Sequence, residues 1–352
     1  MDNRIKEVLI SSKNTILDAV QQMDRVNRKL LIVFNENKYY GLISIGDVQR
    51  AIIAKTSLDN PLSVILRDEV KICYKGISGQ NIKKQMLQIR AEFMPIIDEI
   101  GGLYDVVFWE DIFRGEVRAD YPKLNLPVVI MAGGKGTRMR PITNVIPKPL
   151  IPLGDRTIIE EIIGRFHKFG CDDYHLSVNY KADLIKHYLE NHLENDVDVK
   201  YFKEDKPLGT AGSLFMLKND LKGSFFVINC DILIDDDYSA IYKYHKKNEN
   251  VITIVAALKS YNISYGVIET SENGRLDSIK EKPELTFQIN SGMYILESSI
   301  LDMIPENKFF HITELIENCR SKGLNVGVFP VSEKSWKDIG EWDQYIENLK
   351  VL

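Results

Sequence analysis

The sequence has few cysteines and no long apolar run. Its 352 residues include only four cysteines, at positions 73, 171, 230 and 319, and no two of them form a CxxC pair. A zinc cluster or a disulfide framework is therefore not expected, and reduced thiols in the cytoplasm fit this usage better. No stretch approaches the roughly 18 apolar residues that a membrane helix needs, and the N-terminus lacks the apolar core of a signal peptide. We therefore expect a cytoplasmic protein with no membrane partner.

An excess of charge of one sign is also absent. Forty-five lysines and arginines stand against fifty aspartates and glutamates, which gives a formal net charge of −5. This weak balance argues against a broad nucleic-acid-binding surface. The composition, 44% hydrophobic and 27% charged, is that of a soluble globular protein. At about 150 residues per domain, the length predicts two domains.

One segment, 118–127, separates two regions of different character. It contains two prolines and several charged residues, and an apolar run follows it. Such a segment interrupts a helix and is typical of a linker. We predict a first domain over 1–120, itself divided into halves of about 1–57 and 58–120, and a second domain over 121–352.

The first region contains an internal repeat. Val33 precedes Asp47 by fourteen residues, and Ile97 precedes Asp111 by the same spacing. Each unit is typical of a short strand, a turn, a second strand and an acidic residue at the start of a helix. A further helix is expected to begin at Thr15.

This pattern resembles the paired repeats of the cystathionine-β-synthase (CBS) type. The resemblance implies an α+β pair that binds an adenine or guanine nucleotide in its cleft and regulates an attached domain. It places Asp47 and Asp111 where a carboxylate contacts ribose, and Thr15 where a hydroxyl contacts phosphate or ribose. From the residues alone, both aspartates can equally be helix N-caps, and the pair can serve only as a dimerisation surface.

The second region opens on an apolar run that leads into a glycine-rich loop. The string AGGKGTRMRP begins at Ala132 and has three glycines within four positions, followed by Arg138 and Arg140. Glycines permit positive φ and close approach of the backbone, and successive amides can form an anion-binding nest. The loop therefore predicts a polyphosphate site. It matches neither the Walker A spacing nor the dinucleotide fingerprint.

A lysine between two prolines follows this loop. Pro147 and Pro149 restrict the backbone around Lys148 and so provide a rigid mount for one cation. The combined string, from Ala132 to Leu153, resembles the signature of sugar-1-phosphate nucleotidylyltransferases. The resemblance implies a Rossmann-like (GT-A-like) α/β domain with a mixed, mostly parallel sheet. Helical patterns at 158–169, 182–192 and 238–247 alternate with strand-like runs and agree with that fold.

The resemblance implies a reaction and its residues. The family transfers a nucleotidyl group from a nucleoside triphosphate to a sugar 1-phosphate and releases pyrophosphate. Asp231, at the end of an apolar strand-like run, and Asp338 match its Mg²⁺ ligands, and Arg138 and Lys148 its phosphate-contacting cations. The implied nucleotide contacts are Ala132, Gly133, Gly134, Gly136, Thr137, Gly209 and Thr210. The implied sugar-phosphate contacts are Gly266, Glu281, Lys282 and Asn290.

The sequence also gives an expectation for the nucleotide and the sugar. The string LGTAG, which begins at Leu208, is typical of guanylyltransferases. A CBS pair ahead of such a domain resembles the glucosamine-1-phosphate guanylyltransferases of bacterial legionaminic acid synthesis, which implies GTP and glucosamine 1-phosphate as substrates. Mannose or heptose 1-phosphate, and uridylyl, cytidylyl or thymidylyl transfer, stay open.

Two further classes of protein also stay open. The first is a catalytically inactive, CBS-gated regulatory protein. The second is a nucleotide-sugar-dependent glycosyltransferase that uses the run of aspartates at 235–237 as its metal motif. In each case we expect a homo-oligomer.

Overall fold

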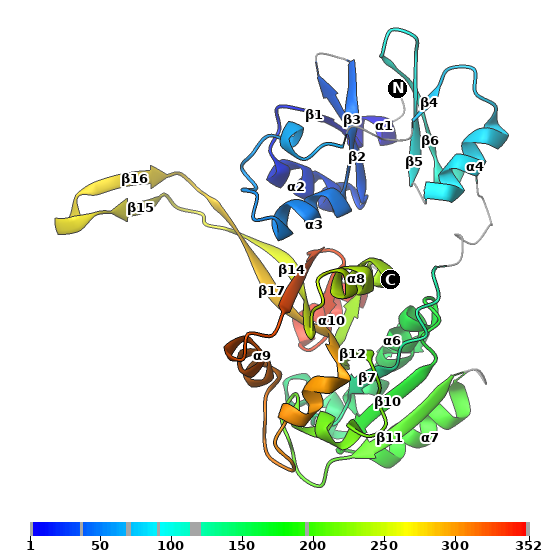
Figure 1. Cartoon of the computed structure of the whole chain (residues 1–352), viewed down its shortest axis with the longest axis vertical. Helices are drawn as coiled ribbons and strands as arrows, with labels where there is room; N and C mark the ends of the chain where they lie inside the picture. The colour runs from blue at the N-terminus through cyan, green and yellow to red at the C-terminus, as the bar shows by residue number, and fades with distance from the viewer. Residues whose placement is uncertain are drawn as a thin grey trace. The chain divides into compact units, whose positions relative to one another are not determined.

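The chain divides into two compact units, Met1–Asp120 and Tyr121–Leu352. The computed structural model in Figure 1 describes residues 3–35, 38–67, 72–89, 92–112, 121–193 and 197–349. The first residues of the predicted linker, 118–120, lie outside these ranges. Each unit is described below by itself.

The first unit contains two three-stranded sheets with the same strand order. In each sheet the first strand pairs in parallel with the second, and the second pairs antiparallel with the third. The strands are β1 (Leu9–Ser11), β2 (Leu30–Asn35), β3 (Lys38–Ser44), β4 (Cys73–Tyr74), β5 (Phe93–Ile97) and β6 (Leu103–Phe108). The sequence repeat is therefore visible as two copies of one topology.

The helices of the first unit follow the same repeat. Each second strand is preceded by an eleven-residue helix, and each third strand runs directly into another helix. The first residue of that helix makes an equivalent hydrogen bond in both halves. Ile45 N–H donates to Lys29 O, and Trp109 N–H donates to Glu92 O, both at 2.8 Å. The helices are α1 (Asn3–Glu7), α2 (Ile16–Val26), α3 (Ile45–Ile53), α4 (Gly79–Ile89) and α5 (Trp109–Ile112).

The second unit is built on one seven-stranded mixed sheet with the order β11-β10-β7-β12-β17-β14-β18. Four of its six neighbouring pairs are parallel, and the pairs of β17 with β12 and β14 are antiparallel. The strands are β7 (Val128–Met131), β10 (Asp173–Val178), β11 (Asp198–Lys203), β12 (Ser224–Asn229), β14 (Ile252–Asn262), β17 (Glu284–Glu297) and β18 (Val326–Ser332). The predicted α/β fold with a mixed, mostly parallel sheet is confirmed.

Helices cover both faces of this sheet. Val128 and Ile130 pack against α6, α7 and α8, whereas Val129 packs in a second cluster with α9. Strands buried on both faces need near-continuous apolar sequence, which the run at β7 has. The helices are α6 (Ile158–His167), α7 (Ala182–His192), α8 (Tyr238–Lys247), α9 (Ile312–Ser321) and α10 (Trp342–Leu349). Among the described helices none has the length and apolarity that a membrane crossing requires.

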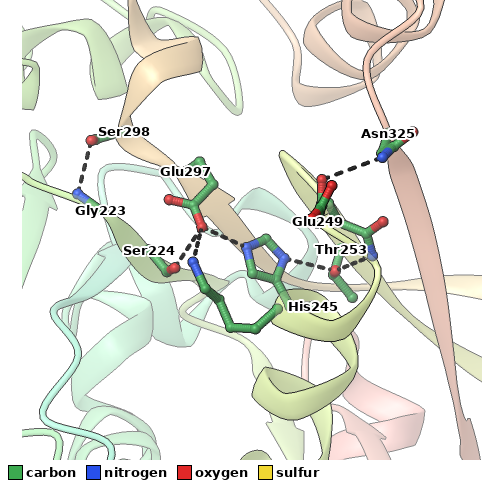
Figure 2. Close-up of polar contacts among 10 residues, drawn as sticks. Gly223, Ser224, His245, Glu249, Thr253, Glu297, Ser298 and Asn325 are labelled. Atoms are coloured by element: carbon green, nitrogen blue, oxygen red, sulfur yellow. Dashed lines mark hydrogen bonds and ion pairs between the residues drawn. The ribbon is translucent and has the colours of Figure 1, made fainter.

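A buried polar network fastens α8 to the sheet (Figure 2). His245 is fully buried, with Nδ1 2.8 Å from Thr253 Oγ1 and Nε2 3.2 Å from Glu297 Oε1. Ser224 Oγ and Lys246 Nζ donate to the same carboxylate oxygen. Burial lowers the pKa of His245, against the pull of Glu297, so the ring is held neutral. Because Ser224 begins β12 and Asp231 follows its last residue, this network lies at the opposite end of β12 from Asp231.

Strands β14 and β17 extend beyond the sheet as a two-stranded ribbon. The neighbouring β18 pairs only with Ile252–Leu258 of β14, while β14 and β17 stay paired to Asn262 and Glu284. The short hairpin of β15 (Val267–Thr270) and β16 (Leu276–Lys280) continues the ribbon. Figure 1 shows this extension in yellow, standing away from the body of the second unit. We call residues 259–288 the arm.

Candidate active site

Four charged side chains that lie far apart in the sequence converge beside one glycine. A Cβ placed on Gly340 would lie 2.7 Å from Asp338 Oδ1 and 3.1 Å from both Arg138 Nη2 and Asp231 Oδ2. Lys148 joins them, because its Nζ lies 2.5 Å from Asp231 Oδ2. A glycine at 340 leaves this space open, so two cations and two carboxylates share one small volume.

Strand pairing brings the two carboxylates together. Asp231 follows β12 and immediately precedes β13 (Ile232–Ile234), which pairs antiparallel with β19 (Trp336–Asp338). In this register Ile232 lies opposite Asp338, and Ile339 N–H donates to Asp231 O at 2.8 Å. The end of a central strand is where ligands bind in open α/β sheets.

Lys148 is held in a buried position by the turn that carries it. It begins the one-turn 3₁₀ helix Lys148–Leu150, whose preceding Pro147 is extended. The Lys148 side chain is 8% exposed and that of Asp231 is 15% exposed. The ion pair therefore lies in a largely desolvated place, where charge interactions are stronger than at the surface.

Arg138 reaches the same place from the glycine-rich loop. It sits in the 3₁₀ turn Thr137–Met139, and its side chain is 57% exposed. Its Nη2 lies 3.7 Å from Asp231 Oδ2, and its Nη1 lies 3.1 Å from Glu341 Oε1. Gly136 makes the turn with φ of +61°, and a Cβ there would lie 2.8 Å from Thr143 Cγ2. Only glycine allows the loop to pack so closely.

The two carboxylates affect each other electrostatically. Burial, and in addition the like charge of Asp231, raises the pKa of Asp338, against the Gly340 N–H and the charges of Lys148 and Arg138. A further cation, in addition to Lys148 and Arg138, would relieve that repulsion. The described residues contain no cluster of three or more metal-ligating side chains. Two adjacent carboxylates suit Mg²⁺, which is commonly held by one or two carboxylates together with substrate phosphates.

Cys230 directly precedes Asp231, just after the end of β12. Its side chain is buried, and burial raises its pKa to about 12. The thiol therefore stays protonated and acts as a small packing residue.

The glycine-rich loop contacts a buried glutamate that the sequence analysis did not single out. Glu204 Oε1 accepts from Ser177 Oγ at 2.7 Å, and Oε2 accepts from Leu208 N–H at 3.0 Å. A Cβ on Gly133 would lie 3.5 Å from Glu204 Oε1, while Gly134 faces open space. Glu204 thus joins the LGTAG segment to Ser177 of β10, beside Gly133 of the loop. Its only sequence signal is its position four residues before that segment.

The structure gives Gly209 and Thr210 roles in packing. Gly209 has φ of +81°, and a Cβ there would lie 2.7 Å from Phe310 O. Thr210 Oγ1 accepts from the N–H of Ile312, the first residue of α9, at 3.0 Å. These contacts secure the segment next to Glu204 and leave its contact with a nucleotide base as a prediction.

The predicted sugar contacts separate into two groups. Asn290 accepts from Gly292 N–H, and a Cβ on Gly292 would lie 2.8 Å from Asn229 Nδ2, which places this part of β17 beside β12 and Asp231. Six residues along β17, about 20 Å at the usual rise, separate Asn290 from Glu284. The other three lie beyond that point, in the arm, where Glu281 Oε2 would lie 3.0 Å from a Cβ on Gly266. The structure does not bring Gly266, Glu281 and Lys282 to the carboxylates.

The three residues predicted for the CBS cleft each have a partner within the first unit. Thr15 caps α2 by accepting from Asp18 N–H at 3.1 Å. Asp47 is buried and accepts from Ser44 N–H at 2.8 Å and from Arg67 Nε at 2.7 Å. Asp111 pairs with Arg4 at 3.1 Å. The N-cap interpretation of the two aspartates is wrong, because each is the third residue of its helix and Ser44 is the cap of α3.

The aspartate run has a capping role. Asp237 Oδ1 accepts from Ser239 N–H at 2.9 Å and so caps α8. This contact accounts for part of the motif that a glycosyltransferase would use for its metal ion.

Comparisons with known proteins identify the class of the second unit. The family model described as nucleotidyl transferase matches residues 127–352, and the chain therefore belongs to that family. A second model, the CBS domain, matches residues 4–54. The family accounts for the mixed sheet, and the CBS match accounts for the first half of the repeat.

Named relatives have several different specificities. A UTP–glucose-1-phosphate uridylyltransferase of Synechocystis is 30% identical over 64% of this chain and 63% of its own length. A mannose-1-phosphate guanyltransferase of Debaryomyces hansenii is 33% identical over 60% of each chain. The chain thus spans about three fifths of the length of these relatives.

A solved structure supports the fold. The putative glucose-1-phosphate thymidylyltransferase of Bacillus anthracis matches 64% of this chain and 94% of its own, with 21% identity and a TM-score of 0.51. At this identity the match shows the nucleotidyltransferase fold alone.

Proposed function

We propose that this protein is a sugar-1-phosphate nucleotidylyltransferase that joins a nucleoside triphosphate to a sugar 1-phosphate and releases pyrophosphate. The observation that carries the proposal is the convergence of Arg138, Lys148, Asp231 and Asp338 beside Gly340. Two polyanionic substrates must meet in such a reaction, so positioning and neutralisation of charge are the main catalytic tasks.

The arrangement suggests a role for each side chain. An oxygen of the sugar phosphate attacks the α-phosphorus while pyrophosphate departs on the opposite side. Lys148, buried and fixed between two prolines, is placed to neutralise the α-phosphate or the sugar phosphate. Arg138, exposed on the loop, is placed to stabilise charge on the departing pyrophosphate. The attacking phosphate oxygen is already anionic, so no general base is needed.

Asp231 and Asp338 are the residues that would hold Mg²⁺. When bound, the ion supplies further neutralisation of charge on both phosphate groups. Lys148 also supplies an opposite charge to Asp231. The loop residues Gly133 to Thr137 offer backbone amides and open space at Gly134 for the triphosphate, whereas Ala132 N–H donates to Ser177 O at 3.0 Å.

For substrate identity we favour GTP and glucosamine 1-phosphate, with the product used in surface glycan or legionaminic acid synthesis. The support is the LGTAG segment, whose Leu208 N–H donates to Glu204 beside Gly133 of the loop, and the CBS region ahead of the domain. Mannose or heptose 1-phosphate and the other nucleoside triphosphates are the alternatives. Asn290 is the proposed sugar contact beside the carboxylates, and Glu281 and Lys282 stay predictions.

A set of assays with different substrate pairs tests both the proposed enzyme class and the proposed substrates. Purified protein with Mg²⁺ is assayed for pyrophosphate release with each of five nucleoside triphosphates against glucosamine, mannose and glucose 1-phosphates. Release with at least one pair supports the class, and the fastest pair identifies the substrates. Release with none would favour the catalytically inactive regulatory protein. Against that alternative stands the geometry, because an inactive relative has no need to keep all four charges in contact.

The first unit is proposed to bind a nucleotide and modulate the rate. AMP is the most informative ligand for this test, because it cannot donate a nucleotidyl group and so is not a substrate of the second unit. Calorimetric titration of AMP into the full chain should show heat, and AMP should change the rate of pyrophosphate release. No heat and no change of rate would leave the unit as an assembly domain.

A further inference from the structure

The first turn of α10 holds the segment that carries both candidate cations. Trp342 Nε1–H donates to Arg140 O at 2.9 Å, and Tyr345 O–H donates to Pro152 O at 2.7 Å. The Tyr345 side chain is buried, and the rings of Trp342 and Tyr345 lie 5.9 Å apart, edge to face. Because Lys148 lies between Arg140 and Pro152 in the sequence, these two hydrogen bonds fasten the chain on either side of it.

Glu341, the residue before α10, contacts a side chain of the same segment. Its Oε1 lies 3.1 Å from Arg138 Nη1, whereas Asp231 Oδ2 lies 3.7 Å from Arg138 Nη2. The two carboxylates therefore approach different nitrogens of one guanidinium. The guanidinium is planar and rigid, so contacts at two of its nitrogens restrict its rotation as well as its position.

The contact of Glu341 with Arg138 adds little to the stability of the fold. The Arg138 side chain is 57% exposed and that of Glu341 is 53% exposed. Ion pairs at such positions contribute about 0.2–1 kcal/mol in double-mutant cycles. The backbone of Glu341 is held separately, because Tyr345 N–H donates to Glu341 O at 2.9 Å. The consequence of this ion pair is therefore expected at the site and not in the fold.

We propose that Glu341 is a positioning residue, which orients the guanidinium of Arg138 before the substrates bind. The inference rests on the proposed function. Because Glu341 contacts Nη1, the Nη2 of Arg138 is directed to the volume beside Gly340, where the phosphate groups are proposed to react. An arginine side chain has about 2 kcal/mol of rotamer entropy to lose when it becomes ordered. Ordering it in advance removes part of this cost from the transition state, so the effect is expected in kcat.

Steady-state kinetics of pyrophosphate release by the full chain test the proposal, with Mg²⁺ and the substrate pair that the wild type uses fastest. Glu341→Ala should lower kcat about 10-fold, equivalent to about 1.4 kcal/mol, with little change in KM for the nucleoside triphosphate. Glu341→Gln keeps a neutral acceptor for Nη1, of roughly half the strength, so its kcat should be only about threefold low. A lower KM with an unchanged kcat would show that Glu341 competes with phosphate for Arg138, and would overturn the proposal.

An Arg138→Ala background separates positioning from a structural role. In that background Glu341→Ala should cause no further loss of kcat, because the group through which it acts is gone. A further loss of about 10-fold there would mean that Glu341 acts through the fold, and the proposal would fail.

The matched control is Asp343→Ala, which removes an exposed carboxylate from the first turn of the same helix. It weakens the interaction of acidic side chains with the helix dipole and should keep the wild-type kcat. An equal loss of kcat in Asp343→Ala and Glu341→Ala would attribute the effect to the helix start and overturn the proposal. Absence of pyrophosphate release by the wild type with every substrate pair would defeat the proposed function itself, whereas a normal kcat in Glu341→Ala would defeat the positioning role alone.

Discussion

Replacing Lys148 by methionine separates stability from catalysis at the candidate site. The substitution keeps most of the side-chain volume and removes the charge that lies 2.5 Å from Asp231 Oδ2. Asp231 is then left 15% exposed, with Arg138 at 3.7 Å as its compensating charge and Asp338 as a like-charged neighbour. Removing one partner of a buried ion pair costs about 3–5 kcal/mol. Because Arg138 stays nearby, we expect the lower end, about 3 kcal/mol.

The double variant Lys148→Met/Asp231→Asn tests whether the loss of stability comes from the unpaired charge of Asp231. It removes the uncompensated charge, so its free energy of unfolding should return to within about 1 kcal/mol of the wild-type value. The kcat should stay at least about 100-fold low in both variants, a loss of about 2.7 kcal/mol in transition-state stabilisation. Lys200→Met is the matched control, because its ion pair with Asp173 is solvent-exposed and worth less than about 1 kcal/mol.

Urea unfolding measures these values. Trp336 and Trp342 lie in the second unit and Trp109 in the first, so a Trp109→Phe background makes tryptophan fluorescence report the second unit alone. The reasoning is refuted if Lys148→Met is no less stable than Lys200→Met. It is also refuted if the double variant is no more stable than Lys148→Met.

Three further predictions concern other parts of the second unit. Arg138→Ala should lower kcat at least about 100-fold with little loss of stability, because the side chain is 57% exposed; near-normal turnover would remove Arg138 from its role. Gly209→Ala should cost about 2 kcal/mol in urea unfolding, because its φ is +81° and the new Cβ meets Phe310 O, whereas Gly134→Ala, in open space, should not. The pKa of His245 is lowered because burial disfavours its protonated form in the folded state. Its contribution to the unfolding free energy is therefore complete above about pH 6.5 and is lost as the pH falls, at no more than about 1.4 kcal/mol per pH unit. Between pH 7 and 5 the unfolding free energy of His245→Gln should therefore fall less than that of the wild type, and equal slopes would contradict the assignment.

Much of the second unit could be predicted because its signals are local. The helices at 182–192 and 238–247 occur with the predicted bounds, and the helix from Ile158 ends at His167, two residues before the predicted end. Periodicity and capping act over a few residues, so they can be read directly from the sequence. The glycine-rich loop is local in the same way.

Other parts of the site could not be predicted, because long-range packing positions them. Glu204 has no motif of its own and becomes notable only where Ser177 and Leu208 meet it. Lys282 is one of the predicted sugar-phosphate contacts, yet it lies between β16 and β17, in the arm. In the first unit, Asp47 lies at the predicted helix start, but its pairing with Arg67 is tertiary.

The amino-acid sequence by itself determined the class of protein, the order of its two regions and the identity of the charged residues. Only the tertiary structure decided that Arg138, Lys148, Asp231 and Asp338 share one volume beside Gly340. The physical reason is the pairing of β13 with β19, which sets Ile232 opposite Asp338 across more than a hundred residues. The same distinction holds for the outer hairpin of the arm, because Ile268 and Ile279 lie on one face only through the pairing of β15 with β16.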